Sequence, residues 1–359
     1  MAKRSWHTLY NIYMKKTAVV ILNWNGADML MRFLPSVVEY SEAEADVFVA
    51  DNGSTDNSCE VVEQHFPSVR LIRLPQNYGF AEGYNQALKE LEYDYFLLLN
   101  SDVEVTPHWL QPMLSYMEQH TEVAACQPKL LDWKQKEKFE YAGAAGGFID
   151  RYGYPFCRGR IFNDIETDQA QYDEVVPLFW ATGAALMVRR ADWLEVGGLD
   201  GRFFAHMEEI DLCWRLRLRQ RAIVCISESR VYHVGGATLS KENPRKTFLN
   251  FRNNLLMLYK NLPEQELSSV MRIRCLLDWI AAAKFLLTDG KENVKAVFAA
   301  RREFKKMKHE YAALRQENQR KAVSHNIPER MSASLLVQYY LYGRKTFSSL
   351  VHLLTGHKA

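Results

Sequence analysis

Four short apolar runs alternate with stretches of helical periodicity along the first hundred residues. The runs are rich in β-branched or leucine side chains and end in polar residues, which is typical of buried strands. They cover residues 17–22, 47–50, 69–72 and 97–99. The stretch after the first run, residues 27–40, places its apolar residues on one helical face, namely Leu30, Phe33, Leu34 and Val37. The order predicts an α/β fold with a parallel sheet covered on both faces.

Polar residues follow two of these runs where the strands are expected to end. Asp51 follows the second run directly, and Asp102 comes shortly after the fourth. Ligands of open α/β sheets bind beyond the carboxyl ends of the strands, so both carboxylates are expected at the binding edge. A hard cation such as Mg²⁺ or Mn²⁺ prefers oxygen ligands beside substrate phosphates, which makes Asp102 a candidate metal ligand. The alternative is a capping aspartate in a strand-to-helix loop, with Pro107 at the start of the next helix.

A series of motifs follows in a fixed order over roughly residues 17–262. They are ILNWNG (21–26), VADNGSTD (49–56), NYGFA (77–81), LLLNSD (97–102), WATGAA (180–185), VGGLD (196–200), MEEIDLCWR (207–215) and VYHVGG (231–236). Together they resemble a family-2 glycosyltransferase, whose members have the GT-A fold: a Rossmann-like, mostly parallel central sheet flanked by helices. The Gln/Arg-x-x-Arg-Trp element of processive synthases is absent. The resemblance is therefore to the non-processive, rhamnosyltransferase-like bacterial type.

The resemblance implies a nucleoside-diphosphate sugar donor, linked to UDP or dTDP. An acid at the position of Asp51 binds the pyrimidine N3–H in similar enzymes, and an ionised carboxylate can only accept hydrogen bonds. Trp24 is placed to pack on the base. The residues implied for the donor nucleotide are Leu22, Asn23, Trp24, Asp51, Asn77, Gly79, Asn85 and Asn100. Residues 51–56 are also typical of a turn followed by a helix cap.

The resemblance also implies a divalent cation, Mg²⁺ or Mn²⁺. Asp102 is the last acid of an Asp-x-Asp-like element whose first acid is replaced by Asn100. His233 matches the position where similar enzymes supply a further ligand, and imidazole suits Mn²⁺. The implied metal ligands are therefore Asp102 and His233.

Three carboxylates, Glu208, Glu209 and Asp211, fall within four positions. In the resembling pattern, Glu-Asp-x-Asp, the second acid takes the acceptor proton, which makes Glu209 the candidate general base. Asp211 is then structural, and Glu208 either supports the base or binds the acceptor. Crowding by like charges raises a carboxyl pKa, which suits a base at neutral pH. The alternative is that these acids only stabilise a helix N-terminus.

The segment that contains Trp180, Thr182 and Gly183 resembles the floor of an acceptor site. Small residues there let the backbone approach a sugar. A tight turn before a strand is the equally favoured alternative. The acceptor implied by the resemblance is a saccharide or a lipid-linked saccharide.

The chain divides into three parts in this interpretation: an N-terminal extension (1–16), a GT-A domain (17–262) and a C-terminal helical region (263–359). The domain comprises a nucleotide-binding half (17–105) and an acceptor and catalytic half (106–262). The last region combines short apolar, Trp-containing stretches with basic helical sequence. This combination favours a peripheral membrane interface. The alternative is a helical extension packed on the core with a solvated basic face.

Composition excludes some classes of protein. The chain has 359 residues, is 48% hydrophobic and carries a formal net charge of +2, which supports a large core but no general nucleic-acid binding. Its six cysteines are scattered and read as reduced packing residues.

The sequence therefore predicts a metal-dependent inverting glycosyltransferase of cell-surface polysaccharide synthesis, located in the cytoplasm at the cytoplasmic face of the inner membrane. The alternatives are a nucleotidyltransferase of the same fold and a non-catalytic sugar-nucleotide-binding protein. A nucleotidyltransferase would want a basic, Gly-rich loop after the first strand, and residues 23–26 contain neither Lys nor Arg.

Overall fold

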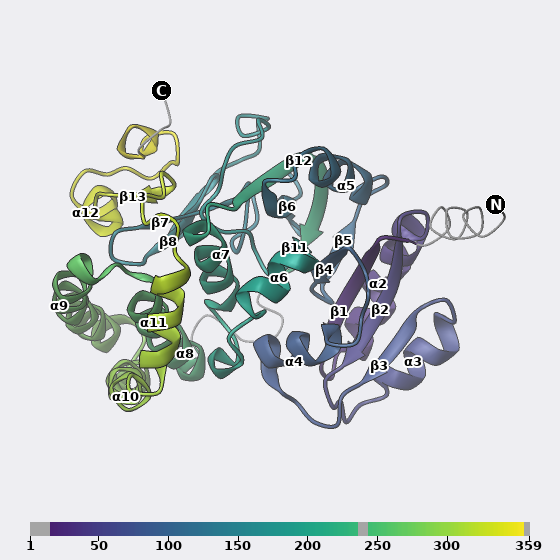
Figure 1. Ribbon diagram of the computed structural model, residues 1–359, viewed down its shortest axis with the longest axis horizontal. Helices are drawn as coiled ribbons and strands as arrows, with labels where there is room; N and C mark the ends of the chain where they lie inside the picture. Colours follow the sequence, from purple (N-terminus) through teal and green to yellow (C-terminus); the bar gives the residue numbers. More distant parts are fainter. Residues whose placement is uncertain (1–14, 236–242, 355–359) are drawn as a thin grey trace, which may run out of the picture.

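A mixed sheet of eight strands forms the centre of the computed structural model, which describes residues 15–235 and 243–354 (Figure 1). The spatial order is β3-β2-β1-β4-β11-β6-β12-β5. The strands are β1 (Thr17–Asn23), β2 (Ala45–Asp51), β3 (Arg70–Arg73), β4 (Tyr95–Leu99), β5 (Val103–Val105), β6 (Val123–Asp132), β11 (Ala185–Arg189) and β12 (Ala222–His233). The first four strands are parallel, whereas β11 runs antiparallel to both of its neighbours. The α/β prediction is confirmed, with a sheet that is mostly rather than wholly parallel.

Helices cover both faces of this sheet, as the alternating pattern predicts. They are α2 (Ala27–Ser41), α3 (Ser58–His65), α4 (Gly79–Leu88), α5 (Leu110–Gln119), α6 (Arg190–Val196) and α7 (Glu208–Leu218). Helix α2 buries the predicted face, including Leu30, Phe33, Leu34 and Val37. The central strands are almost continuously buried, which is why their sequence is apolar without alternation.

A second, five-stranded sheet was not predicted. Its order is β10-β9-β8-β7-β13. The strands are β7 (Gly147–Asp150), β8 (Pro155–Cys157), β9 (Arg160–Ile161), β10 (Asp164–Ile165) and β13 (Arg330–Met331). Strands of two to four residues are too short to show a periodicity of two, so the sequence carries no pattern for them.

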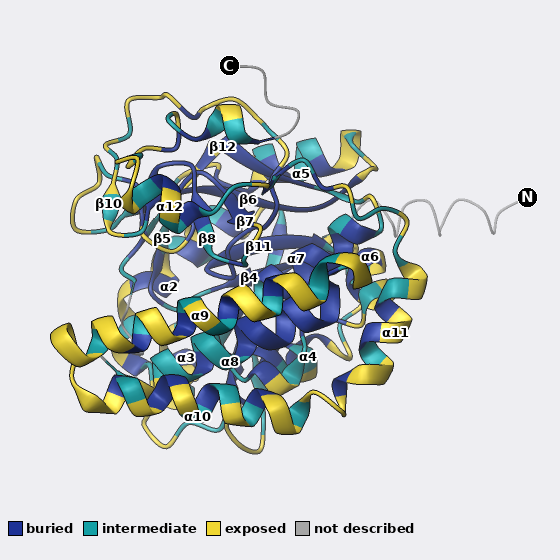
Figure 2. Cartoon of the chain, turned by 90° about the vertical axis from the view of Figure 1, so that its left-hand side faces the viewer, coloured by how far each residue is buried: buried dark blue, intermediate teal, exposed yellow. Residues whose placement is uncertain are grey.

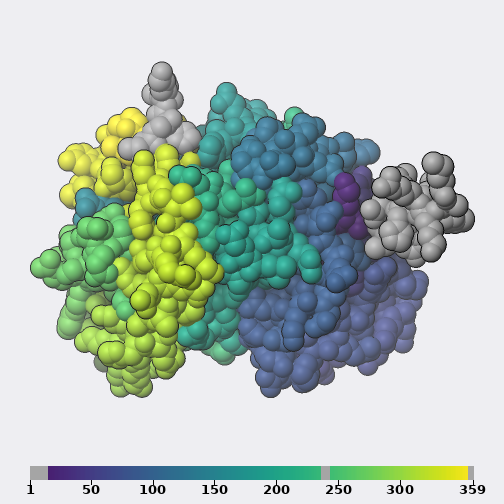
Figure 3. All heavy atoms as spheres, viewed as in Figure 1, coloured from purple at the N-terminus to yellow at the C-terminus, as the bar shows by residue number. Residues whose placement is uncertain are grey.

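The chain after the main sheet is helical, as predicted. It contains α8 (Pro244–Asn261), α9 (Glu264–Thr288), α10 (Lys291–Met307), α11 (Tyr311–Lys321), α12 (Leu335–Tyr340) and the 3₁₀ turn η2 (Val351–Leu353). A further 3₁₀ turn, η1 (Gly201–Phe203), precedes α7. These helices gather on the side of the molecule away from β1–β3 (Figures 1 and 3). Among the described segments, no helix has the length and hydrophobicity that a membrane crossing requires.

The C-terminal helices are joined firmly to the rest of the protein. Strand β13 pairs with β7, and the buried Asp150 carboxylate accepts a hydrogen bond of 2.8 Å from Leu335 N. Arg315 of α11 donates to the carbonyls of Tyr259 and Leu262 at 2.6 Å each. The inner faces of these helices therefore pack on the core, while α9 and α10 expose their outer faces (Figure 2). The predicted N-terminal extension, residues 1–16, lies almost wholly outside the described residues.

The strand register brings polar residues to one edge of the sheet. Asn23 at the end of β1 is paired with Asp51 at the end of β2, and Ile21 is paired with Leu99 at the end of β4. On the far side, β12 ends at His233, which is paired with Val103 of β5. Residues that follow β1, β2 and β4 thus meet at the carboxyl edge, with His233 beside Asp102.

Candidate active site

The loops after β1 and β2 are held together by polar contacts. Asn23 Nδ2 lies 3.4 Å from both Asp51 Oδ1 and Ser54 Oγ, and the Asn23 side-chain oxygen is buried without a partner. Asp51 also accepts a 3.1 Å hydrogen bond from Ser54 N, as expected of a turn. Asn25, at a positive φ of 51°, accepts from Thr55 N at 2.7 Å. The turn interpretation and a binding role for Asp51 are therefore compatible, because the turn fixes the carboxylate at the strand end.

Asn52 joins this edge to the loop before α4, and sequence analysis did not single it out. Its side chain donates to Asn77 Oδ1 at 3.2 Å and to Gly79 O at 3.0 Å, and accepts from Tyr78 N at 3.0 Å. Gly79 has a φ of +78°, and a Cβ there would lie 2.5 Å from the Phe204 ring. The position therefore requires glycine for both its backbone conformation and its close packing.

His233 lies between two carboxylates. Its Nε2 is 3.1 Å from Asp102 Oδ1 and its Nδ1 is 3.3 Å from Glu140 Oε1, and all three side chains are buried. Burial alone would lower the pKa of His233, but the charges of Glu140 and Asp102 raise it to about 10. Burial would raise the pKa of Asp102, but its hydrogen bond to His233 holds it below the ordinary value. The amide of Asn100 completes the group, 3.3 Å from His233 Nε2.

Glu140 is the residue of this group that sequence analysis missed. It lies in the loop after β6, far in sequence from both partners, and no motif surrounds it. Histidines that bind metals usually direct their second ring nitrogen to a carboxylate, which fixes the ring orientation. Glu140 occupies that position relative to His233 Nδ1.

The donor set of Asp102 and His233 fits a divalent cation that also binds a diphosphate. A carboxylate oxygen and an imidazole nitrogen already lie side by side, and their chemistry suits Mn²⁺ or Mg²⁺. Within residues 15–235 and 243–354, no cluster of three or more His, Cys, Asp or Glu side chains could hold a metal ion. Two protein ligands beside substrate phosphates are the usual arrangement for Mg²⁺.

Two unpaired carboxylates mark the start of α7. Glu208 Oε2 and Glu209 Oε2 are both buried and lack a hydrogen-bond partner. Burial raises the pKa of Glu209 to about 7. Burial, and then the charge of Glu209, raise the pKa of Glu208 well above its ordinary value. A buried, unpaired carboxyl with a pKa near neutrality is the state that a general base requires.

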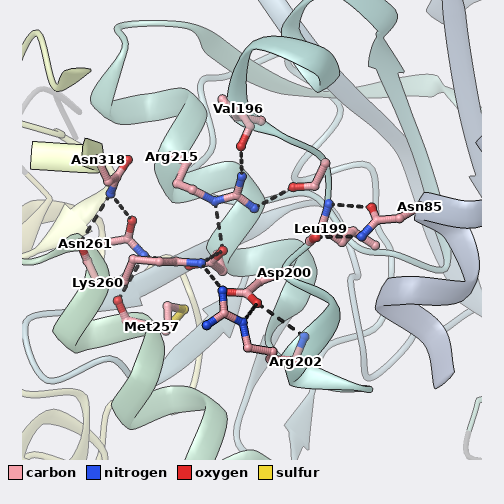
Figure 4. Close-up of polar contacts among 12 residues, drawn as sticks. Asn85, Val196, Leu199, Asp200, Arg202, Arg215, Met257, Lys260, Asn261 and Asn318 are labelled. Atoms are coloured by element: carbon pink, nitrogen blue, oxygen red, sulfur yellow. Dashed lines mark hydrogen bonds and ion pairs between the residues drawn. The ribbon is translucent and has the colours of Figure 1, made fainter. Parts of the chain in front are cut away.

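Asp211 differs from its two neighbours because its oxygens are fully engaged. It accepts from Arg215 Nε at 2.9 Å, from Lys260 Nζ at 2.7 Å and from Asn261 Nδ2 at 2.8 Å. Lys260 continues the network to Asp200 at 2.8 Å (Figure 4). This network ties α7 to α8 and leaves Glu208 and Glu209 as the acids with free oxygens.

The residues just before β11 link Asn100, which lies beside His233, to Glu209. Asn100 N donates to Ala184 O at 3.0 Å. A Cβ on Gly183 would lie 3.1 Å from Phe80 and 3.8 Å from Glu209 Cβ. Of the three residues predicted for the acceptor, Gly183 therefore lies beside Glu209.

Trp180 and Thr182 are buried within the protein. The Trp180 indole donates to Phe148 O at 2.9 Å, and its ring covers Gly147. Thr182 N donates to Gln127 Oε1 at 2.9 Å. Both residues support the segment, and the structure does not bring their side chains to the free carboxylates.

The residues predicted for the nucleotide fall into two groups. Leu22 and the half-exposed Trp24 flank Asn23 at the edge of the sheet, and Asn77 belongs to the loop held by Asn52. Asn85 lies apart from them. Its amide donates to Leu199 O at 2.8 Å and accepts from Leu199 N at 3.0 Å (Figure 4). Asn85 thus ties α4 to the loop after α6.

Residues 18–170 match the family described as Glycosyl transferase family 2. One similar curated protein is the N-acetylglucosaminyl-diphospho-decaprenol L-rhamnosyltransferase of Mycobacterium tuberculosis, 27% identical over 233 residues, which are 60% of this chain and 75% of that protein. Another is the rhamnosyltransferase WbbL of Escherichia coli, 27% identical over 207 residues, which are 56% of this chain and 76% of WbbL. Both matches cover a larger share of the chain than the family match does.

Two solved structures resemble the fold. GalNAc-T7 with UDP, GalNAc and Mn²⁺ has a TM-score of 0.56 and 14% identity, covering 84% of this chain and 57% of that one. TarS 1–349 of S. aureus, in complex with UDP-GlcNAc, has a TM-score of 0.54 and 16% identity, covering 86% and 90%. At these identities the likeness concerns the fold alone, and it confirms the predicted GT-A architecture with its C-terminal helices.

Burial of two acids makes a testable contribution to stability. The folded-state pKa of each acid lies above its unfolded value. The protonated acids therefore contribute fully to the stability of the folded protein at low pH. This contribution is lost as the pH rises through about 7 for Glu209. Glu208→Gln and Glu209→Gln are therefore each expected to raise the melting temperature at pH 8, and to raise it much less at pH 5. Differential scanning fluorimetry at both pH values measures this, and equal or lower melting temperatures at pH 8 would contradict the buried, unpaired state.

Proposed function

The chain belongs to glycosyltransferase family 2, and from that premise we propose a metal-dependent, inverting transfer of a sugar from a nucleoside diphosphate to an acceptor hydroxyl. Sugar transfer itself follows from the family; the metal, the stereochemistry and the substrates are the proposal. Nucleotidyl transfer and non-catalytic binding find no support in the relatives.

One observation carries the proposal. The same edge of the sheet holds a paired carboxylate and imidazole, Asp102 and His233, while two carboxyl groups at the start of α7 each have a buried oxygen without a partner. Transfer from a nucleoside diphosphate requires both parts: charge that stabilises a departing diphosphate, and a base that removes a proton from the acceptor.

Donor binding is assigned to residues 17–105. Asp51 is proposed to accept from the N3–H of a uracil or thymine base, and Trp24 to pack on that base. The support lies in the strand register, which sets Asp51 beside Asn23 and leaves the Asn23 oxygen without a partner. Asn77 and Gly79 shape the adjoining loop. A donor linked to UDP or dTDP is expected.

Asp102 and His233 are proposed to hold Mg²⁺ or Mn²⁺, with Glu140 fixing the ring of His233. Bound there, the cation would supply positive charge for the leaving diphosphate. GalNAc-T7, a protein of similar fold, is described with UDP and Mn²⁺, which agrees with this donor set.

Glu209 is proposed as the general base, with acceptor binding and catalysis in residues 106–262. Its pKa of about 7 leaves it partly ionised at neutral pH, so that it can take the hydroxyl proton as the acceptor attacks. Glu208 is assigned to supporting Glu209 or binding the acceptor. A single base, without a nucleophile of the protein, implies direct displacement and inversion at the anomeric carbon.

The acceptor is proposed to be a saccharide or a lipid-linked saccharide of cell-surface polysaccharide synthesis. The similar M. tuberculosis enzyme is named for a decaprenol-linked acceptor, and WbbL for rhamnosyl transfer. A lipid-linked acceptor would bring the protein to the cytoplasmic face of the inner membrane as a peripheral protein.

Nucleotide binding tests the metal assignment. A thermal-shift screen of nucleoside diphosphates and their sugars should find stabilisation by UDP or dTDP compounds that increases with Mn²⁺, because a ligand of the native state raises the melting temperature. Asp102→Ala should abolish the part that depends on Mn²⁺, and His233→Ala should reduce it. Asn52→Ala serves as a control that loosens the nucleotide loop without touching either ligand. An unchanged Mn²⁺-dependent shift in Asp102→Ala would overturn the assignment.

Turnover tests the base. Glu209→Gln keeps the shape of the side chain and removes the proton acceptor, so kcat should fall by roughly 10²–10⁴, the usual contribution of general base catalysis. Nucleotide affinity should stay within about twofold, because the donor residues are separate. Glu208→Gln is the matched control and should lose much less. Near-normal kcat in Glu209→Gln together with an inactive Glu208→Gln would assign the base to the other acid.

A further inference from the structure

Helix α9 exposes an apolar face that the transfer reaction does not use. One side of the helix is buried at four-residue intervals and packs on the protein, through Val270, Arg274, Asp278 and Ala282. The opposite side is apolar over its last four turns and consists of Ile273, Leu276, Trp279, Ile280, Ala283, Leu286 and Leu287, with Lys284 among them. Three of these, Leu276, Ile280 and Leu287, are 62%, 57% and 87% exposed. Apolar residues exposed singly are common on protein surfaces, whereas a contiguous row of them is typical of an interaction surface.

Neighbouring elements extend this surface with aromatic side chains. Trp279 packs edge-on against Phe298 of α10, with ring centroids 5.0 Å apart. Lys284 Nζ lies 3.4 Å from the hydroxyl of Tyr340 at the end of α12, where the exposed Leu341 and Tyr342 follow. Figure 2 shows α9 crossing this side of the molecule between α10 and α12, largely in the colour of exposed residues.

The charges around the face are mostly basic. The outer side of α10 exposes Lys295, Arg302 and Lys305. Two exposed acids lie at the end of the face: Asp289 follows α9, and Glu292 pairs with Lys295. After Glu266, the one acid in α9 is Asp278, which is buried and paired with Arg274 and Arg301. The exposed apolar stretch of α9 therefore presents no carboxylate.

From this pattern we propose that the outer face of α9, with Phe298 and residues 340–342, docks on an anionic lipid bilayer. An apolar stripe bearing tryptophan and bordered by Lys and Arg is the composition that inserts at the headgroup boundary and attracts anionic lipids. A second copy of the chain fits less well, because a two-fold contact through this face would bring the basic borders of two α10 helices together. The surface deepens the proposed membrane contact, but it is independent of the metal and the base.

Vesicle sedimentation tests this docking surface with the full chain. Wild-type protein should pellet with phosphatidylcholine vesicles that contain phosphatidylglycerol, and less so as salt rises, because salt screens the basic contacts. In the triple variant Leu276→Gln, Ile280→Gln and Leu287→Gln, the affinity for these vesicles should fall by about tenfold or more. A matched control replaces three exposed apolar residues elsewhere, Met31→Gln, Val175→Gln and Leu194→Gln, and should bind like wild type.

Two outcomes would contradict the proposal that this face docks on a bilayer. One is equal binding of the triple variant and wild type. The other is no vesicle binding by wild type; a dimer in sedimentation velocity that the triple variant dissociates would then assign the face to a second copy of the chain. Neither outcome affects the transferase proposal, because that proposal is tested separately by measuring turnover with a water-soluble acceptor. That turnover should be unchanged in the triple variant, because no α9 residue belongs to the site.

A different observation, at the turn before α7, carries a second inference. Phe204, His206 and Met207 have positive φ angles of 65°, 72° and 72°, a conformation that costs a side-chain-bearing residue about 1–2 kcal/mol. This turn leads directly into Glu208 and Glu209. Contacts from elements outside the turn must therefore stabilise this backbone conformation.

Asn253 of α8 supplies most of that support. Its side-chain amide is fully buried, and the two hydrogens of Nδ2 are shared among the carbonyls of Phe203, Ala205 and His206 at 2.9, 2.9 and 2.8 Å. On the other side, the N-terminus of α4 donates to Phe204 O through Phe80 N at 2.6 Å and Ala81 N at 3.1 Å. The turn is thus clamped between α8 and the helix that follows the predicted nucleotide loop.

We infer that Asn253 is a positioning residue for Glu209, acting through the backbone of residues 203–207. This inference rests on the proposed role of Glu209. Asn253→Ala should lower kcat by roughly 10–100-fold, because small displacements of a catalytic group are costly. Donor affinity should stay within about twofold. The acid limb of the kcat profile, which reports the base, should also shift.

The matched control is Asn318→Ala. Asn318 is similarly buried and bonds α11 to Asn261 of α8 at 2.7 Å, but it does not touch the turn. Both variants should lose stability, and only Asn253→Ala should lose kcat per folded molecule. If Asn253→Ala keeps a normal kcat and pH profile while Glu209→Gln is inactive, Asn253 is structural only and the base assignment stands. If Glu209→Gln keeps near-normal kcat, the proposed base fails first.

Discussion

The register of the parallel strands is the constraint on which the rest of the site depends. Pairing of Asn23 with Asp51, and of Ile21 with Leu99, makes three strands end at the same edge. Strand β12, which runs in the same direction as β4, then ends at His233, and its pairing with β5 sets His233 beside Asp102. A slip of one residue would turn each of these side chains to the other face of the sheet. The continuous burial of β1 and β4 holds the register, so the hydrophobic core and the polar edge are specified together.

The start of α7 stores unfavourable energy where chemistry is proposed. Two acids each have a buried oxygen without a hydrogen-bond partner, and three side-chain-bearing residues before them have a positive φ angle. The surroundings offset this cost with strong polar contacts. Asp211 is held by Arg215, Lys260 and Asn261, and Asn253 binds three carbonyls of the strained turn. Functional sites often contain strained or unsatisfied groups, and the contacts around such a site offset the loss of stability.

The sequence predicted those elements whose apolar pattern extends over several residues, and it missed features that depend on short strands or on distant contacts. Strands β1, β2 and β4 and helix α2 were predicted because each has an apolar pattern several residues long. The second sheet was missed because its strands are too short. Glu140 was missed because no motif surrounds it and its contact with His233 is distant in sequence. Asn52 lies within the motif of residues 49–56, but its contact with Asn77 is also distant in sequence and leaves no pattern. Asn85 stays a prediction for the nucleotide site, and its contact with Leu199 is one that the sequence could not reveal. The proposed roles of Asp51, Asp102, His233 and Glu209 stay predictions that the geometry supports.

The anomeric configuration of the product tests the central claim most directly. With the donor that the thermal-shift screen identifies, one-dimensional proton NMR of the first product reports the coupling constant or chemical shift of its anomeric proton. One base and no nucleophile of the protein require a single displacement, so the new bond should have the configuration opposite to that of the donor. A product that retains the donor's configuration would contradict the assignment of Glu209 as a general base acting on the acceptor.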